Sequence, residues 1–244
     1  MPDELTSGDD RLRDEFNRWA EAGHGEKMEQ DHLSIAEQTL RLMELQPGER
    51  ILDLGCGSGW ATRRLASLVA AGPKGSGQVV GLDISDEMIR RARDQSRDCE
   101  NALFIWGSAA EIPWQEDYFH KVLSIESFYY YPEPERVLAE LCRVMAPGGR
   151  LFILINLYRD NPFSLRWVEQ LKVPVQVRSE QEYLELLAAH AFEAVEARRI
   201  PDLSPTPEEH CSRWFGNREE WLEFKRLGAL LLTAQKPRRP VLAP

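Results

Sequence analysis

The chain has little of what disulfide-bonded and membrane-spanning proteins need. Its four cysteines (Cys56, Cys99, Cys142 and Cys211) lie far apart in 244 residues and form no Cys-x-x-Cys pair. They therefore predict reduced thiols and neither a zinc site nor a disulfide framework. No apolar run approaches the ~20 residues that span a bilayer. The first residues are polar and acidic, unlike a secretory signal, so we expect a cytoplasmic protein with no membrane span.

Positive charge is also scarce. Lys and Arg number 30 against 40 Asp and Glu, which gives a formal net charge of −10. Because nucleic-acid binding depends on counterion release by Lys and Arg, this charge disfavours a nucleic-acid partner. Among the histidines, His24 and His32 lie near Glu29, but not in a known ligand spacing, so we expect no metal site. Nothing in the sequence indicates an oligomeric state.

What the chain does have is the size and the pattern of one α/β domain, with 43% hydrophobic residues. Strand-like and helix-like segments alternate from residue 51 onwards, which predicts a doubly wound, mostly parallel sheet covered on both faces. The last connection lacks an obvious crossover helix, so we expect the final strand to be antiparallel. The seven expected strands are 50–54, 78–83, 103–106, 121–125, 150–157, 193–199 and 228–235. Helices are expected at about 60–71, 85–98 (with Ser85 as N-cap), 134–145 (stopped by Pro147-Gly148-Gly149) and 179–190.

The N-terminal region, residues 1–46, is expected to form a helical lid. Leu33, Ala36, Leu40 and Met43 recur at helical spacing, and the glycines in 23–28 predict a break and a hinge between two helices. The remaining boundaries place the main domain at 47–236, with insertions at about 159–178 and 201–226, and a flexible tail at 237–244.

One short motif carries the most information. An apolar strand containing Asp53 runs directly into Gly55-x-Gly57-x-Gly59, and a helix follows. Glycines at alternate positions let the backbone turn sharply and approach a ligand closely. The dinucleotide-binding fingerprint reads Gly-x-Gly-x-x-Gly. Here the third glycine comes one residue early and Trp60 follows, so the loop is not suited to a pyrophosphate.

The second strand ends in an acid, Asp83, at the edge of the sheet where doubly wound folds bind ligands. A carboxylate there can accept both hydroxyls of a ribose. Ile84 and Met88 follow closely enough to pack on an adenine ring. This predicts an adenosine-containing ligand, without deciding between NAD and S-adenosylmethionine (SAM).

Two further motifs come in the same order along the chain. After the third strand the sequence reads Gly107-Ser108-Ala109-Ala110-Glu111-Ile112-Pro113-Trp114. After the fourth it runs to Pro132-Glu133-Pro134, and a helix then leads to Pro147-Gly148-Gly149. With the glycine loop and Asp83, this pattern resembles class I SAM-dependent methyltransferases, in particular the ubiquinone/menaquinone-methyltransferase-like branch. The resemblance covers roughly 50–157, and more weakly 179–199 and 228–236.

The resemblance implies a Rossmann-like methyltransferase fold, SAM as cofactor and S-adenosyl-L-homocysteine (SAH) as product. It places Asp53 and the glycine loop at the methionine portion and Asp83 at the ribose. Ser108 and Ala109 would meet the adenine, although the family has an aspartate at Ser108 and a glutamate at Ala110. The complete set of expected cofactor residues is Asp53, Gly55, Cys56, Gly57, Ser58, Gly59, Asp83, Ile84, Met88, Ser108, Ala109, Ala110, Ser124 and Ile125.

Methyl transfer from a sulfonium needs alignment, a dry pocket and, for an acidic acceptor, a base. Glu126 is the candidate base, and Tyr130 can orient an acceptor; either side chain could equally serve packing or support. Aromatic residues that could bind the substrate are Tyr129, Tyr131, Trp19 and Trp214, with packing roles as the alternative. We therefore expect methyl transfer to a small organic acceptor through an oxygen, nitrogen or carbon atom.

Three other functions remain open. A SAM-binding enzyme could do different chemistry, such as methylene transfer to a lipid, but the related cyclopropane-forming enzymes have a glutamate where this chain has Tyr129. A nicotinamide-dependent oxidoreductase is disfavoured by Asp53 and the early third glycine. A non-catalytic binding module would keep the same ligand residues.

Overall fold

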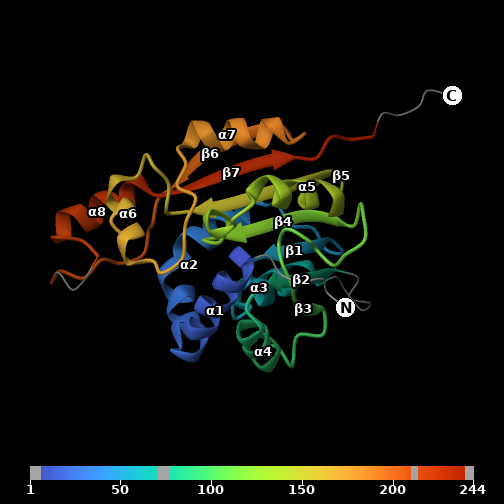
Figure 1. The fold of residues 1–244 in the computed structure, drawn as a ribbon, viewed down its shortest axis with the longest axis horizontal. Helices are drawn as coiled ribbons and strands as arrows, with labels where there is room; N and C mark the ends of the chain where they lie inside the picture. The colour runs from blue at the N-terminus through green and yellow to red at the C-terminus, as the bar shows by residue number, and fades with distance from the viewer. Residues whose placement is uncertain (1–6, 71–76, 210–213, 240–244) are drawn as a thin grey trace.

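The computed structural model describes residues 7–70, 77–209 and 214–239. They form one seven-stranded sheet with helices on both faces (Figure 1). The strand order is β3-β2-β1-β4-β5-β7-β6, and β7 runs antiparallel to both of its neighbours. The doubly wound sheet and its antiparallel last strand, both expected from the sequence, are confirmed.

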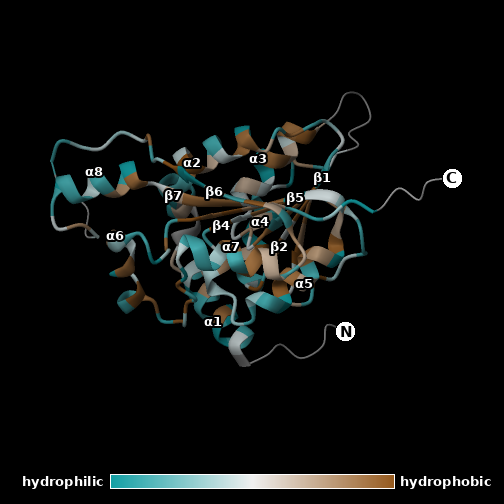
Figure 2. Ribbon diagram, turned by 90° about the horizontal axis from the view of Figure 1, so that it is seen from above, coloured by the Kyte–Doolittle hydropathy of each residue, from teal (hydrophilic) through white to brown (hydrophobic). Residues whose placement is uncertain are grey.

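Most strands lie in the middle of the molecule and are apolar, as Figure 2 shows, because helices cover both sides of the sheet. In β1, for example, Ile51, Leu52 and Leu54 are fully buried. The exception is the edge strand β6 (Glu193–Ile200), which is rich in charged residues and largely exposed. The strands are β1 (Arg50–Leu54), β2 (Gln78–Asp83), β3 (Ala102–Trp106), β4 (Phe119–Ile125), β5 (Met145–Ile155), β6 (Glu193–Ile200) and β7 (Ala229–Gln235).

The helices begin with capping residues that the sequence makes recognisable. Ser85 accepts the backbone N–H of Met88 at 3.0 Å, which confirms it as the N-cap of the helix that follows. Ser179 and Glu182 form a capping box. The helices are α1 (Ser7–Glu21), α2 (His24–Leu42), α3 (Trp60–Val69), α4 (Asp86–Gln95), η2 (Phe128–Tyr130), α5 (Pro134–Val144), α6 (Pro162–Leu165), η3 (Val168–Gln170), α7 (Glu180–Ala189) and α8 (Arg218–Leu227).

Three local details differ from the sequence prediction. Pro147-Gly148-Gly149 does not stop α5, which already ends at Val144; it lies within β5, where Gly148 and Gly149 exchange backbone hydrogen bonds with Lys236. The break between the first two helices is limited to residues 22–23, with Gly23 in the left-handed region (φ 74°), and residues 24–28 are helical. The connection between β6 and β7 contains a helix, α8, and β7 is nevertheless antiparallel to β6.

The N-terminal helices pack on the main body. α1 contacts α4 and α2, and α2 contacts α3. Both lie on the side where β1 and β2 end, so residues 7–42 are positioned to cover the carboxyl ends of these strands. The separation into a lid, a main domain and a tail stays a prediction.

The two insertions pack against each other at one end of the molecule, where α6 lies beside α8 (Figures 1 and 2). Trp167 has its ring centroid 5.4 Å from that of Phe224 and 6.1 Å from that of Trp214. Residues 237–239 have no regular structure, and the rest of the tail lies outside the described residues.

The described cysteines, Cys56, Cys99 and Cys142, are free thiols, and Cys211 lies outside the described residues. In the described part of the chain, no helix has the length and apolar character needed to cross a membrane.

Candidate active site

The three glycines of the β1–α3 loop have positive φ angles of 76°, 52° and 79°, but they meet different surroundings. A Cβ on Gly55 would lie 2.5 Å from Ser127 Cβ, and one on Gly59 would lie 2.5 Å from Phe104 Cε1. A Cβ on Gly57 would meet nothing within 4 Å. Gly55 and Gly59 therefore allow close packing of the protein, whereas Gly57 faces open space that a ligand can occupy.

This loop is held by the end of β2. The N–H groups of Gly55 and Cys56 donate to the carbonyl of Leu82 at 2.8 and 3.0 Å. The N–H of Gly57 donates to Asp83 Oδ2 at 2.8 Å, and the N–H of Ser85 donates to Asp83 Oδ1 at 2.9 Å. A carboxylate offers about four acceptor sites, so Asp83 retains capacity for a diol. Burial raises the pKa of this carboxyl above its ordinary value.

The acid within β1 is still more enclosed. Asp53 is 2% exposed and accepts a 2.6 Å hydrogen bond from Thr62 Oγ1. Burial, and to a smaller extent the charge of Asp83, raises the pKa of Asp53 to about 7. A cation bound nearby would favour its ionised form.

Two adjoining cavities lie at this edge of the sheet. The first, the α1 cavity, is lined by Asp9, Leu12, Phe16, Met28, Leu54, Gly55, Gly57, Leu82, Asp83, Ile84, Met88, Gly107, Ala109, Ile125, Glu126, Ser127, Tyr130 and Tyr131. The second, the α2 cavity, is lined by Met28, His32, Asp53, Gly55, Cys56, Gly57, Ser58, Trp60, Ala61, Met88, Ile125 and Glu126. Their shared residues make them parts of one hollow, which α1 and α2 cover.

Glu126 lies where the two cavities meet. It follows β4 with a φ of 52°, a conformation that is rare for a residue with a side chain and is concentrated at functional sites. Its carboxylate accepts the Tyr129 hydroxyl at 2.9 Å and the Asn156 N–H at 2.6 Å. Burial raises the pKa of Glu126, and the nearby charge of His32 is the largest influence that opposes this rise.

The three consecutive tyrosines that follow β4 make different contacts. Tyr129 holds Glu126, whereas Tyr130 lines the α1 cavity and packs edge-on against Phe16, with ring centroids 4.9 Å apart. Tyr131 lines the same cavity and donates to Ser127 Oγ at 3.2 Å. Burial raises the pKa of all three phenols, so they are neutral at physiological pH.

Several predicted site residues lie outside both cavity linings. Ser124 is buried, with its Oγ 2.7 Å from Ser127 Oγ, and Gly59 and Ala110 are packed into the protein. Trp19 donates to Glu15 Oε1 at 3.0 Å, and Trp214 packs on Trp167. The Ser108 hydroxyl donates to Asp9 Oδ2 at 2.8 Å and accepts the Ala110 N–H at 3.1 Å. Their contributions to ligand binding stay predictions.

The two N-terminal helices supply lining residues that no sequence motif marks: Asp9, Leu12 and Phe16 from α1, and His32 from α2. In the sequence, His32 stands out only as a potential metal ligand close to His24 and Glu29. Helical periodicity marks the apolar faces of these helices, but it does not say what those faces cover. Among the described residues, no group of three or more His, Cys, Asp or Glu side chains is placed to hold a metal.

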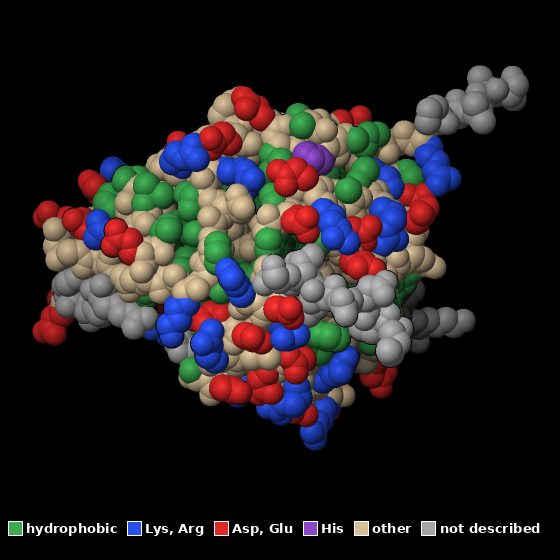
Figure 3. Space-filling model, in the orientation of Figure 1, with side chains coloured by type: hydrophobic (Ala, Val, Ile, Leu, Met, Phe, Trp, Pro, Cys, Tyr) green, Lys and Arg blue, Asp and Glu red, His purple; other side chains and the backbone are tan. Residues whose placement is uncertain are grey.

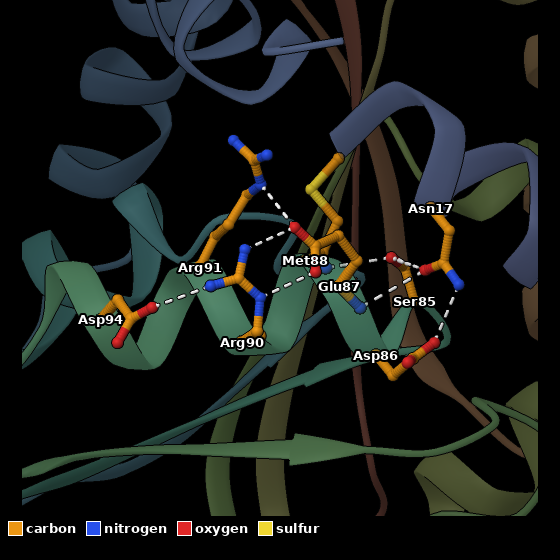
Figure 4. Close-up of polar contacts among 8 residues, drawn as sticks. All are labelled: Asn17, Ser85, Asp86, Glu87, Met88, Arg90, Arg91 and Asp94. Carbon is orange, nitrogen blue, oxygen red and sulfur yellow. Dashed lines mark hydrogen bonds and ion pairs between the residues drawn. The ribbon is translucent and has the colours of Figure 1, made fainter. Parts of the chain in front are cut away.

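The contact that fastens α1 over the site also went unpredicted. The Asn17 amide donates to Asp86 Oδ1 at 2.9 Å and accepts the Ser85 hydroxyl at 2.6 Å (Figure 4). Asn17 is thereby attached to the first turn of α4, the helix that begins three residues after Asp83. Because the Ser85 N–H also donates to Asp83, α1 is connected through Ser85 to the expected ribose site.

Comparisons with known proteins agree with this geometry. Residues 45–226 match the family described as "Methyltransferase domain". The chain is 28% identical to a 27-O-demethylrifamycin SV methyltransferase of Amycolatopsis mediterranei, over 97% of this chain and 98% of that protein. It is 35% identical to the ubiquinone/menaquinone biosynthesis C-methyltransferase UbiE of Ectopseudomonas mendocina, over 51% of this chain and 48% of that protein.

A solved structure is similar along almost its whole length. It is a Haloferax volcanii putative methyltransferase in complex with the Trm112 methyltransferase activator, with a TM-score of 0.83 and 31% identity. The similarity covers 92% of this chain and 98% of that one.

The residues present fit SAM. Gly57 borders an open space that any Cβ at this position would enter. The carboxylates of Asp83, at the end of β2, and Asp53, within β1, line the cavities beside it. The chain belongs to the methyltransferase domain family, as a class I SAM-dependent methyltransferase of the ubiquinone/menaquinone-methyltransferase-like branch.

Proposed function

We propose that this enzyme transfers the methyl group of SAM to a hydroxyl oxygen of a small, largely apolar molecule. The observation that carries the proposal is the placement of His32 and the buried Glu126 in the lining of one cavity. Methylation of a hydroxyl converts R–OH and SAM into R–OCH₃, SAH and a proton. The proton needs an acceptor, and a histidine beside a buried carboxylate is suited to take it.

The cofactor orientation is part of the proposal. Asp83 accepts the ribose hydroxyls, Ile84 and Met88 contact the adenine, and the methionine portion lies along Gly57 towards Asp53. This orientation is supported by the lining of the two cavities, which runs from Ile84 in one to Asp53 in the other. It leaves the shared region, at Ile125 and Glu126, for the reacting methyl group.

The acceptor would bind beneath the lid. Leu12, Phe16 and Met28 give that side an apolar surface, and Tyr130 contributes a phenol that can orient a hydroxyl. His32 removes the hydroxyl proton as the oxygen attacks. Glu126 stabilises the resulting imidazolium, and its own orientation is held by Tyr129 and by the Asn156 N–H.

The nature of the acceptor is supported by two further observations. The Amycolatopsis relative is named for an O-demethylated rifamycin, which favours oxygen over other acceptor atoms. On the face drawn in Figure 3, Lys and Arg side chains are interspersed with Asp and Glu, a surface ill suited to a polyanion. A second candidate is a carbon acceptor, as in the name of the UbiE relative.

The free thiols of the described cysteines support a cytoplasmic location.

The test is a panel of small aromatic and macrocyclic alcohols, amines and activated carbon acids, incubated with deuterium-labelled SAM. Product masses and fragmentation identify the methylated atom. We expect labelled ethers, and a loss of turnover of roughly 10²- to 10⁴-fold in His32→Gln, with SAH affinity retained. His190→Gln is the matched control, because this half-buried histidine caps the end of α7, outside both cavity linings, with its Nδ1 2.8 Å from the Leu186 carbonyl oxygen.

Labelled products confined to nitrogen or carbon would contradict the oxygen assignment. Full activity of His32→Gln would contradict its role as the base. SAH binding without any labelled product across the panel would favour the non-catalytic binding module.

A further inference from the structure

The hydroxyl of Tyr131, a residue expected at the substrate, lies at the place where the two cavities meet. A Cβ on Gly55 would lie 3.2 Å from the Tyr131 hydroxyl oxygen, and Gly55 lines both cavities. Burial, and to a smaller extent the charges of Asp83 and Asp53, raises the pKa of Tyr131. The phenol oxygen is therefore within electrostatic reach of both the acid expected at the ribose and the acid expected at the methionine portion.

The proton of the Tyr131 hydroxyl is directed away from the hollow. Ser127 Oγ donates its own proton to the Leu54 carbonyl at 2.9 Å, so Tyr131 must be the donor in its 3.2 Å hydrogen bond with Ser127. The Tyr131 ring also packs edge-on against Phe128, with ring centroids 5.6 Å apart. Of the two lone pairs of the phenol oxygen, the nearby Ser124 hydroxyl can occupy one, so the other remains for a ligand.

A lone pair at this place suits a cation. With the ribose on Asp83 and the methionine portion directed towards Asp53, the sulfur of SAM lies in the region that both cavities share. The positive charge of the sulfonium makes the C–H groups on its methyl and methylene carbons weak hydrogen-bond donors, and a cation removed from water needs acceptors. The sulfur of SAH is uncharged and carries lone pairs of its own, so the same oxygen does not attract it.

We propose that Tyr131 is a cofactor residue, whose phenol oxygen contacts the carbons bound to the sulfonium of SAM while Ser127 holds the phenol proton away from them. The proposal rests on the cofactor orientation given above and assigns Tyr131 to the reacting end of the cofactor instead of the acceptor. It makes the site selective for the charged cofactor over its neutral product. A neutral phenol stabilises the cation less than a carboxylate would, which limits the cost of losing that contact when the sulfonium charge disappears during transfer.

Glu126 also lines the shared region, and its carboxylate could attract the sulfonium as well. The two contributions can be separated, because Tyr131→Phe removes the phenol oxygen and keeps the ring. Glu126 then retains its hydrogen bonds with Tyr129 and the Asn156 N–H. A loss of affinity that depends on the charge at the sulfur position, in a variant that keeps Glu126, therefore reports on the phenol.

The experiment is calorimetric titration of SAM, SAH and sinefungin, without an acceptor, into the native enzyme, Tyr131→Phe and Tyr118→Phe. Sinefungin carries an ammonium group in place of the methylated sulfonium. In Tyr131→Phe we expect SAM to bind roughly 5- to 30-fold more weakly, as the loss of two C–H···O contacts implies, and SAH affinity to change by less than about 2-fold. Sinefungin should lose at least as much as SAM, because its charged N–H groups are stronger donors. Tyr118→Phe is the matched control, because it removes a phenol that donates to Gln78 near the opposite end of the sheet.

Equal losses of SAM and SAH affinity in Tyr131→Phe would overturn the proposal, because they would show a general change of the site. Unchanged affinity for all three ligands would also overturn it and would return Tyr131 to the acceptor, with the cofactor orientation intact. If none of the ligands binds the native enzyme, the cofactor orientation itself is refuted. None of these measurements involves the acceptor or His32, so the result is independent of the assignment of oxygen as the methylated atom.

Discussion

The backbone N–H of Gly57 donates a 2.8 Å hydrogen bond to Oδ2 of Asp83, so the acid that ends β2 holds the glycine loop that follows β1. The other oxygen of Asp83 accepts the N–H of Ser85, the N-cap of α4. One carboxylate therefore connects the glycine loop with the start of the helix to which the lid is fastened. Ligand binding at Asp83 would stabilise all three segments together.

Asp83→Ala is expected to weaken SAH binding by at least about 100-fold. The variant loses two charge-assisted hydrogen bonds to the ribose, each worth about 1.5–3 kcal/mol, and leaves the Gly57 N–H without its partner. Ligand-dependent melting provides the measurement. The native enzyme should gain about 2.7 kcal/mol at 100 times its dissociation constant, with SAM or SAH but not with NAD. An undiminished gain in Asp83→Ala would show that the ribose does not bind there.

Gly57→Ala and Gly59→Ala should impair the protein in different ways, the first mainly in SAH binding and the second mainly in stability. The Cβ of Gly57→Ala enters open space, so the variant should lose about 1–2 kcal/mol of stability from its left-handed backbone and most of its SAH affinity. The Cβ of Gly59→Ala would lie 2.5 Å from Phe104, so its destabilisation should be larger. Chemical denaturation measures the loss of stability, and calorimetry measures the loss of SAH affinity. Gly57→Ala with native affinity would place the ligand away from the loop.

The elements around this loop were predictable because their signals are local. The apolar run of β1 ends at a glycine and that of β2 ends at an acid, and both strands have the expected bounds. The contacts of the lid are not local: Asp9 and Asn17 bond to residues 99 and 68 positions away. Nor does an aromatic side chain in the sequence indicate which residue it packs against: Trp214 contacts Trp167, and its role at the substrate stays a prediction.

Asn17→Ala is expected to loosen the lid without unfolding the domain. The amide joins α1 to Ser85 and Asp86, and losing these bonds should cost roughly 1 kcal/mol in the closed state. SAH should then dissociate about fivefold faster in stopped-flow measurements, while the melting temperature of the free enzyme shifts by only a few degrees. Arg11→Ala, an exposed position on the same helix, is the control. An unchanged dissociation rate in Asn17→Ala would mean that α1 does not gate the site.

If His32 and Glu126 act together in catalysis, Tyr129→Phe should shift the pH profile of kcat/KM. Tyr129 donates to Glu126 and thereby lowers the pKa of this carboxyl, against the rise caused by burial. Tyr129→Phe removes the donor, so the carboxyl should protonate at a higher pH and the acid limb of kcat/KM should move upwards. Tyr118→Phe, which removes a phenol near the opposite end of the sheet, is the control. If the acid limb does not move, Glu126 does not influence the ionisation that controls turnover.

Asp53 predicts that cofactor binding releases a proton. Its pKa is raised to about 7 in the folded protein from 3.8, so between these values the folded state holds a proton that the unfolded chain has lost. The contribution of Asp53 to stability therefore falls as pH rises from about 4 to about 7, the reverse of an ordinary ion-paired carboxylate. The α-ammonium group that SAM and SAH share, placed beside Asp53, would favour the charged form of this carboxyl and expel its proton.

Calorimetric titration of SAH at pH 6 in buffers of different ionisation enthalpy measures the released proton directly. We expect proton release at pH 6 that disappears by pH 8, where the free enzyme is already ionised at Asp53. Affinity should strengthen by up to tenfold per pH unit below pH 7 and level off above it, because each pKa unit corresponds to about 1.36 kcal/mol. Asp53→Asn should bind more weakly and with no such proton release. A pH-independent affinity in the native enzyme would mean that the carboxyl of Asp53 does not face the cation, and the methionine portion would then have to lie elsewhere in the hollow.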